Sequence, residues 1–215
     1  MLERRLDQAG NNLSEAEVKD LLRKKGITTT KFQLPKREDL DSLIIEFPVA
    51  VKVCSSKIIH KTDVGGVFLD IGSREELKQS FDLIKERFPD SEVLVEPMEK
   101  KGPEVIIGLI DDKDFGLSIM FGMGGVMAEL YKDVSFRKLP ISKYDAMEMI
   151  EETKAIAFFK GFRGFKADEG AIIDLLLMIS RLGLELEGRL SQLDLNPVIL
   201  REKGYVVVDA KLVLK

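Results

Sequence analysis

A polar, cationic segment that ends in two glycines carries the single histidine of the sequence, His60. The segment runs from Ser55 to Gly66, and lysines at positions 57 and 61 flank the histidine. An imidazole titrates near neutral pH, so part of it offers an unprotonated nitrogen nucleophile, and the lysines would attract a phosphorylated substrate. Two interpretations follow: a histidine that takes part in chemistry, or an ordinary loop residue.

A hairpin near the end of the sequence carries oxygen-bearing side chains at a regular spacing. Asp194 and Asn196 are two residues apart on one arm, so they share a face, and Asp209 lies on the other arm. A turn centred on residues 202–203 or 203–204 places Asp209 on that face, in the first case across from Asn196, whereas a three-residue turn would direct it away. Two carboxylates and an amide suit Mg²⁺. The alternative is a polar, solvated face of the hairpin.

Charged residues at the ends of predicted strands form a second group of candidates. Lys52 faces away from the alternating valines of its strand and is able to neutralise a phosphate. Glu96 and Glu104 flank a turn, where a carboxylate accepts hydrogen bonds from an amino group or a ribose hydroxyl. Arg137 is interpreted either as a phosphate clamp or as a solvated charge. A glycine-rich run at 122–125 has neither the P-loop nor the dinucleotide-binding spacing, so a plain turn is expected there.

These candidates lie on alternating helices and strands. Ser14-Glu15-Ala16-Glu17 predicts a capped helix, and Ser73 caps another whose apolar positions recur at helical spacing up to Pro89. A further helix is expected over residues 37–46, and a strand over residues 49–54. Later segments predict strands near 66–71, 93–96, 105–110, 117–121 and 134–139, helices from 142 and over 167–186, and the terminal hairpin.

The elements do not follow a strict βαβ order, which indicates an α+β fold with largely antiparallel sheets. A turn after Glu96 suggests two lobes, residues 1–97 with the histidine segment and residues 98–215 with the hairpin. With 45% hydrophobic and 33% charged residues, the 215-residue chain is expected to be globular rather than disordered.

Charge and cysteine content narrow the classes of function. A formal net charge of -4 with both signs interspersed argues against nucleic acid as the main partner. The longest apolar runs are too short or interrupted for a membrane span, the first residues lack a secretory pattern, and Cys54 has no second cysteine, so a cytoplasmic protein is expected. Cys54 itself is expected to fill space in the core.

Several motifs, taken in order, point to one family. They are Pro48-Val49-Ala50-Val51-Lys52-Val53, Ile59-His60-Lys61-Thr62-Asp63-Val64-Gly65-Gly66, Val95-Glu96-Pro97-Met98, Glu104-Val105-Ile106-Ile107-Gly108, Gly122-Met123-Gly124-Gly125, Lys132-Asp133-Val134-Ser135-Phe136-Arg137, Gly161-Phe162-Arg163-Gly164, and Leu193-Asp194-Leu195-Asn196-Pro197 with Val208-Asp209-Ala210. This set resembles the nucleotide-binding β chain of ADP-forming acetyl-CoA synthetase, an ATP-grasp protein related to the succinyl-CoA synthetase β chain. The histidine motif is the specific one.

The resemblance implies an ATP-grasp fold with a nucleotide cleft between its lobes and a reversible reaction that converts acyl-CoA, ADP and phosphate to acid, CoA and ATP. It implies that His60 relays the phosphoryl group. It further implies that Lys52 binds phosphate, that Glu96 and the backbone near Met98 bind adenine, that Glu104 binds the ribose side, and that Asp194, Asn196 and Asp209 bind Mg²⁺. Arg137 is kept beside them as a nucleotide-binding candidate.

The resemblance also implies a partner, because the family's CoA-binding α chain supplies the first phosphohistidine. The chain is therefore expected to act only with that subunit, in an α2β2 assembly. Two alternatives stay open: an ATP-grasp ligase that joins a carboxylate to an amine or thiol by itself, and a subunit that senses adenine nucleotide without turnover. The sequence leaves the acyl group and the preference for ADP over GDP undetermined.

Overall fold

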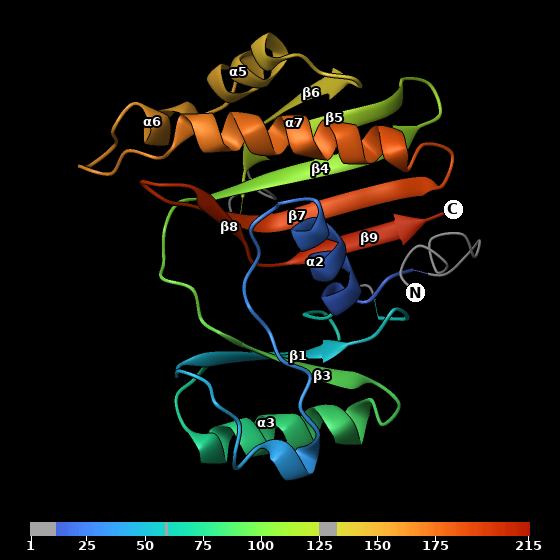
Figure 1. Ribbon diagram of the computed structural model, residues 1–215, viewed down its shortest axis with the longest axis vertical. Helices are drawn as coiled ribbons and strands as arrows, with labels where there is room; N and C mark the ends of the chain where they lie inside the picture. Colours follow the sequence, from blue (N-terminus) through green and yellow to red (C-terminus); the bar gives the residue numbers. More distant parts are fainter. Residues whose placement is uncertain (1–11, 59, 125–132) are drawn as a thin grey trace. The chain divides into compact units, whose positions relative to one another are not determined.

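The computed structural model describes residues 12–58, 60–124 and 133–215, which form two compact units (Figure 1). We call them the Lys52 unit, Leu13–Glu17 with Thr30–Lys100, and the Asp194 unit, which includes Val18–Thr29 and Lys101–Lys215. Both units combine antiparallel sheet with helices, so the predicted α+β class is confirmed. None of the helices in the described part of the chain is long and apolar enough to cross a membrane.

The Lys52 unit is built on a three-stranded sheet in the order β2-β1-β3. Its strands are β1 (Val49–Cys54), β2 (Val67–Ile71) and β3 (Glu92–Pro97), and both neighbours of β1 run antiparallel to it. Helix α3 (Arg74–Arg87) packs on the sheet, with Ser73 accepting a hydrogen bond from the Glu76 backbone as the capping box predicts. Alternate valines of β1 and the apolar stripe of α3 form one buried core.

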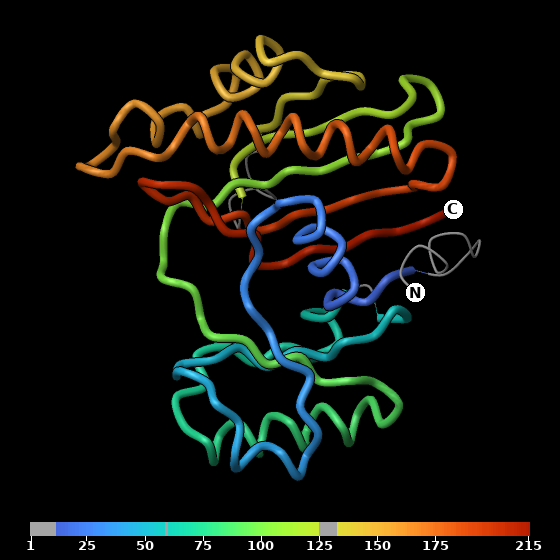
Figure 2. Tube along the Cα trace, in the orientation of Figure 1, coloured from blue at the N-terminus to red at the C-terminus, as the bar shows by residue number. Residues whose placement is uncertain are grey.

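The helix expected over residues 37–46 is not present, and this prediction was wrong. Only a short 3-10 helix forms there, η1 (Arg37–Asp39), followed by turns, and Figure 2 traces this segment to its place beside α3. The Arg74 guanidinium donates hydrogen bonds to the backbone carbonyls of Leu40 and Leu43. Because a side chain from α3 satisfies these carbonyls, they do not need the N–H groups of a continuing helix.

The Asp194 unit contains a six-stranded sheet in the order β6-β5-β4-β7-β8, with β9 also paired to β7. All of these strand pairs are antiparallel. The strands are β4 (Glu104–Asp112), β5 (Gly116–Met123), β6 (Val134–Lys138), β7 (Leu190–Leu200), β8 (Tyr205–Val207) and β9 (Ala210–Leu214).

Helices cover one face of this sheet (Figure 1). They are α5 (Lys143–Glu151), the short α6 (Ile156–Phe159) and α7 (Glu169–Glu185). Helix α7 packs on β4 and β5, and Gly183 permits the close approach, because a Cβ there would lie 2.5 Å from the Leu139 side chain. The long apolar segment of the sequence thus becomes the helix that packs on β4 and β5.

Helix α2 (Glu15–Lys24) begins in one unit and continues in the other. The residues after it pair with the Asp194 unit, since Val207 donates a backbone hydrogen bond to Thr28 and Thr29 bridges to Val207. The grouping therefore differs from the predicted lobes, residues 1–97 and 98–215, because it assigns residues 18–29 to the Asp194 unit and residues 98–100 to the Lys52 unit. The assignment of functions to the two lobes stays a prediction.

Candidate functional site

The histidine segment, Ser55 to Gly66, connects β1 to β2. The backbone N–H groups of its two glycines form hydrogen bonds within the segment, just before β2 begins. Gly66 donates a backbone hydrogen bond of 2.8 Å to Lys61, and Gly65 one of 3.0 Å to Thr62. Gly65 has φ of 66°, and a Cβ on Gly66 would lie 2.5 Å from Cγ1 of Val53. Only glycine fits both positions without strain. Residue 59 of this segment lies outside the described residues.

The His60 side chain is 71% exposed, and its Nδ1 lies 3.9 Å from a carboxylate oxygen of Asp63. This distance is too long for a hydrogen bond. The ring is therefore accessible from solvent, which a general base held in a closed pocket or a core histidine would not be. An accessible imidazole beside a carboxylate is chemically able to accept a phosphoryl group.

Lys52 lies on the face of β1 opposite the valine core, as the strand alternation predicts, and its side chain is only 4% exposed. Its Nζ lies 2.7 Å from Oε1 of Glu96 and 2.9 Å from Oε1 of Glu15. Thr30 donates a hydrogen bond of 2.6 Å to the other Glu96 oxygen. The structure thus brings two of the predicted residues, Lys52 and Glu96, into direct contact within one unit.

Two of these contacts were not predicted from the sequence. Glu15 was read only as part of a capping box, and its spacing does not distinguish a buried ion-pair partner from a charge that complements the helix dipole. Thr30 carried no signal at all. Met98, the other predicted adenine neighbour, follows β3 directly, and its backbone N–H donates a hydrogen bond of 2.9 Å to Pro48.

Of the predicted metal residues, Asp194 and Asn196 lie in β7, and Asp209 lies in the link between β8 and β9. Leu200 pairs with Tyr205 and Val198 with Val207, the register of a turn centred on residues 202–203. Asn196 donates a backbone hydrogen bond of 3.2 Å to Asp209, which accordingly lies across from it. This is the first of the registers considered for the hairpin.

A bulge in β7 coincides with these residues. Ile107 pairs with Leu195 and Val105 with Val198, so Asn196 and Pro197 together face the single residue Ile106. A proline in a central strand is tolerated at a bulge, where no ladder N–H is required. Bulges also re-aim the side chains of a strand, which makes this a suitable place for a site.

The donor set tests whether Mg²⁺ suits this position. Asp194, Asn196 and Asp209 are all half-buried, and they offer carboxylate and amide oxygens, the ligands that a hard divalent cation prefers. The described residues contain no group of three or more His, Cys, Asp and Glu side chains arranged for a metal ion. The set therefore fits a cation that keeps other positions for phosphate or water rather than one enclosed by protein alone.

Glu104 begins β4 and is fixed by the glycine-rich run. Gly124 donates a backbone hydrogen bond of 2.9 Å to the Glu104 carbonyl. A Cβ on Gly124 would lie 2.5 Å from the carbonyl carbon of Val105. Close packing against β4 thus explains the glycine at this position, while Gly125 of the same run lies outside the described residues.

Arg137 lies on β6, where two carboxylates engage its side chain. Its guanidinium donates to Glu152 at 2.6 Å and 3.0 Å and lies 3.5 Å from Glu148. These carboxylates hold the pKa of Arg137 above its usual value, and Arg137 with Ser135 in turn holds the pKa of Glu152 below its usual value. These contacts join β6 to α5, and the role of Arg137 in binding phosphate stays a prediction.

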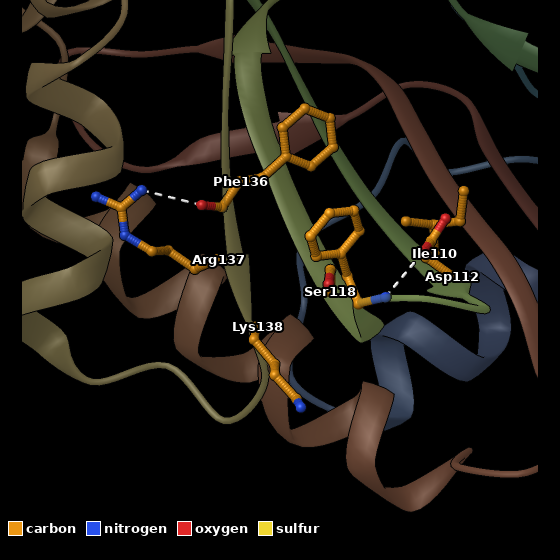
Figure 3. Close-up of a pocket in the computed structure, with 7 residues that line it drawn as sticks. Ile110, Asp112, Ser118, Phe136, Arg137 and Lys138 are labelled. Carbon is orange, nitrogen blue, oxygen red and sulfur yellow. Dashed lines mark hydrogen bonds between the residues drawn. The ribbon is translucent and has the colours of Figure 1, made fainter.

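A surface pocket of about 590 Å³ lies on the sheet of the Asp194 unit, beside the turn that joins β4 to β5 (Figure 3). Ile110, Phe115 and Phe136 give it apolar walls, and Lys138 lies at its edge. Arg137 also borders the pocket, but Figure 3 shows its side chain directed away from the Phe136 ring. The pocket contains none of the predicted metal or histidine residues.

Comparisons with known proteins agree on one family. The family model for the ATP-grasp domain matches residues 4–214. The subunit beta of ADP-forming acetate–CoA ligase II from Pyrococcus furiosus is 42% identical over 230 residues, which cover 100% of this chain and 97% of that protein. ADP-forming acetate–CoA ligase II from Archaeoglobus fulgidus is 42% identical over 206 residues, which cover 94% of this chain but only 30% of that protein.

A solved structure is similar over almost the whole chain. It is dinucleotide-forming acetyl-coenzyme A synthetase 1 from Ca. Korarchaeum cryptofilum in complex with coenzyme A and Mg-AMPPCP, with its phosphohistidine segment pointing towards the nucleotide binding site. The TM-score is 0.81 at 41% identity, and the alignment covers 95% of this chain and 93% of that one.

Proposed function

The chain belongs to the ATP-grasp family and, within it, to the β subunits of ADP-forming acetate–CoA ligases, and from this premise we propose the reaction and the residues that carry it. The chain is the nucleotide-binding subunit of an acid–thiol ligase. The reaction converts acyl-CoA, ADP and phosphate to acid, CoA and ATP, and it is reversible.

His60 is the phosphoryl carrier of this subunit. A nitrogen–phosphorus bond on a histidine of the partner breaks as one forms on His60, and that bond breaks in turn when a terminal oxygen of ADP attacks the phosphorus. The observation that carries this proposal is the 71% exposure of the His60 side chain, in a segment closed by two glycines. The relative whose phosphohistidine segment points towards its nucleotide site supports the same role.

Lys52, Glu96, Met98 and Glu104 are the residues that hold the nucleotide. Lys52 neutralises phosphate charge, while Glu96 and the backbone at Met98 contact the adenine, and Glu104 contacts the ribose side. The buried contact between Lys52 and Glu96 supports a shared role for these two residues. Arg137, whose guanidinium contacts Glu148 and Glu152, is a further candidate for binding phosphate.

Asp194, Asn196 and Asp209 would hold Mg²⁺. When bound, the ion neutralises charge on the phosphate oxygens. The residues themselves orient it through the bulge of β7 and the backbone contact between Asn196 and Asp209. A relative solved with Mg-AMPPCP supports magnesium as the ion.

The chain works with a CoA-binding α subunit in an α2β2 assembly in the cytoplasm. Its Pyrococcus furiosus relative is named as a beta subunit, and the match spans only 30% of the Archaeoglobus fulgidus relative, whose remaining length has room for a CoA-binding part. The acyl pocket would then lie on the partner.

ATP formation tests the proposal. The chain is co-purified with the α subunit and supplied with acetyl-CoA, ADP, phosphate and Mg²⁺. We expect ATP from the wild type, none from His60→Ala, and wild-type rates from Ser56→Ala, a change at an exposed position of the same segment. ATP formation by His60→Ala would overturn the relay. Consumption of ATP by the chain alone, with a carboxylate and an amine, would favour an ATP-grasp ligase that acts without a partner. Nucleotide binding without turnover would favour a subunit that senses adenine nucleotide.

A further inference from the structure

Four charged side chains form a buried cluster within the Lys52 unit. The Glu15 carboxylate contacts two lysines through different oxygens: Oε1 lies 2.9 Å from Nζ of Lys52 and Oε2 lies 3.0 Å from Nζ of Lys61. Lys52 also contacts Glu96 at 2.7 Å. The side chains of Glu15 and Glu96 are 1% exposed, and that of Lys61 is 11% exposed.

Helix capping does not account for the burial of Glu15. Ser14 and Glu17 cap the helix between them, because Glu17 accepts hydrogen bonds of 2.9 Å from the Ser14 backbone and hydroxyl, and Ser14 accepts one from the Glu17 backbone. A buried carboxylate is costly unless it is paired. The position of Glu15 is therefore explained by the two lysines it contacts rather than by the helix end.

Lys61 connects this cluster to the histidine segment. It directly follows His60, and its carbonyl accepts the hydrogen bond from Gly66 that closes the segment. Its side chain points into the cluster, whereas the His60 side chain is exposed. The two adjacent residues thus differ in role: Lys61 anchors the segment, and His60 exposes its imidazole to solvent.

We propose that Glu15 is a positioning residue that holds Lys52 and Lys61 on its two carboxylate oxygens and so fixes the base of the His60 segment beside the nucleotide lysine. The anchoring itself is a property of the chain, and its benefit to phosphoryl transfer rests on the function proposed for His60 and Lys52. Loss of the Glu15–Lys61 contact frees the base of the segment, so His60 spends less time where transfer occurs. Lys52 keeps its contact with Glu96, so nucleotide affinity changes less than the transfer rate.

Amide hydrogen exchange tests the anchoring in the full chain co-purified with its partner. We expect exchange at Gly65 and Gly66 to accelerate at least about tenfold in Lys61→Met and Glu15→Gln, because local opening exposes their hydrogen bonds. Lys61→Arg keeps the charge and should restore near-wild-type exchange. Lys57→Met removes an exposed lysine from the same segment, and Glu17→Gln removes a carboxylate from the same helix turn; both should leave these amides unchanged.

Unchanged exchange in Lys61→Met, or equal acceleration in Lys57→Met, would overturn the proposal. Exchange in α3 reports general unfolding of the Lys52 unit. If Glu15→Gln accelerates exchange in α3 as well, the comparison of Lys61→Met with Lys61→Arg becomes the deciding measurement.

Single-turnover transfer tests the consequence. With the phosphorylated partner as donor, we expect the rate at which label reaches this chain to fall about tenfold in Lys61→Met and to recover in Lys61→Arg, with the KM for ADP changed less than about threefold. A KM effect larger than the rate effect would contradict the positioning role. The two proposals can be contradicted separately. Absence of label on wild-type His60 would contradict the proposed function but not the hydrogen-exchange result. Unchanged exchange at Gly65 and Gly66 in the variants, together with normal labelling of His60, would contradict only the role of Glu15.

Discussion

The amino group of Lys52 lies 2.7 Å from the carboxylate of Glu96, and both side chains are almost completely buried. The pair joins two neighbouring strands, since Ala50 of β1 pairs with Glu96 of β3. A buried ion pair is weak evidence for stability by itself, but removing one member leaves the other charge uncompensated. The pair is therefore both a structural constraint and the centre of the proposed nucleotide site.

Replacement of Lys52 by methionine should destabilise the fold and abolish nucleotide binding. The variant Lys52→Met leaves Glu15 and Glu96 buried without their shared cation, so we expect the free energy of unfolding to fall by about 3–5 kcal/mol in urea titrations. The double variant Lys52→Met/Glu96→Gln should recover part of this loss but not the binding of ADP. Lys203→Met, at an exposed turn, should change stability by less than about 0.5 kcal/mol. A stable Lys52→Met protein that binds ADP normally would rule out this role.

The residues around the β7 bulge should control the requirement for magnesium. Asp194→Asn or Asp209→Asn removes one charged ligand, so the Mg²⁺ concentration that gives half-maximal binding of an ATP analogue should rise at least about tenfold. Titration of Mg²⁺ against analogue binding measures the effect. Glu202→Gln removes a carboxylate from the exposed turn of the same hairpin and should leave the half-maximal Mg²⁺ concentration unchanged. Equal curves for all three variants would mean that the ion binds elsewhere.

The stability supplied by Asp168 should depend on pH. Asp168 caps α7 by accepting a hydrogen bond of 3.1 Å from Ala171 and also accepts one of 2.8 Å from Gly204. These N–H groups, that of Gly204 first, hold the pKa of Asp168 below its usual value. Its stabilisation is thus fully present above the ordinary aspartate pKa of about 4 and is lost as the pH falls through the lower folded pKa.

Comparison of the wild type with Asp168→Ala tests this expectation. The difference in unfolding free energy should be about 1 kcal/mol from pH 5 to pH 8 and should narrow below about pH 4. Asp168→Asn retains a capping oxygen and should lose less than the alanine variant. A difference that stays constant down to acid pH would show that the charge of Asp168 contributes nothing.

Cys54 should be chemically inert in the folded protein. The residue is 3% exposed, and burial raises the pKa of its thiol. Because the thiolate is the reactive form, we expect its reaction with Ellman's reagent at pH 8 to be at least about a hundredfold slower than that of free cysteine. Ser56→Cys adds an exposed thiol to the next segment and should react rapidly. Fast modification of native Cys54 would contradict the burial of its thiol.

Local signals predicted most of the regular elements correctly. Ser73 and the apolar stripe that follows it gave α3, and the alternating valines gave β1 with Lys52 on the face away from the core. The hairpin register was one of the alternatives derived from turn length alone. These features depend on neighbours in the sequence, which is why periodicity and capping were sufficient to find them.

Features that depend on distant residues were missed. The helix expected over residues 37–46 does not form, and the Leu40 carbonyl, which such a helix would use itself, accepts a hydrogen bond from Arg74 instead. Glu15 looked like a helix-end charge, and its burial becomes visible only when the fold brings it to Lys52 and Lys61. The bulge at Asn196 and Pro197 likewise requires knowledge of the partner strand β4. Residue spacing did not decide whether His60 takes part in chemistry or is an ordinary loop residue. The resemblance of its motif to the family favoured the chemical role.

The phosphate on His60 is the most direct test of the account. The chain and its α partner are incubated with acetyl-CoA, radiolabelled phosphate and Mg²⁺, and this chain is then isolated and its phosphorylated peptide sequenced. We predict an acid-labile, base-stable label at His60 that moves into ATP when ADP is added. Label at another residue of this chain, or label that persists after ADP is added, would contradict the account.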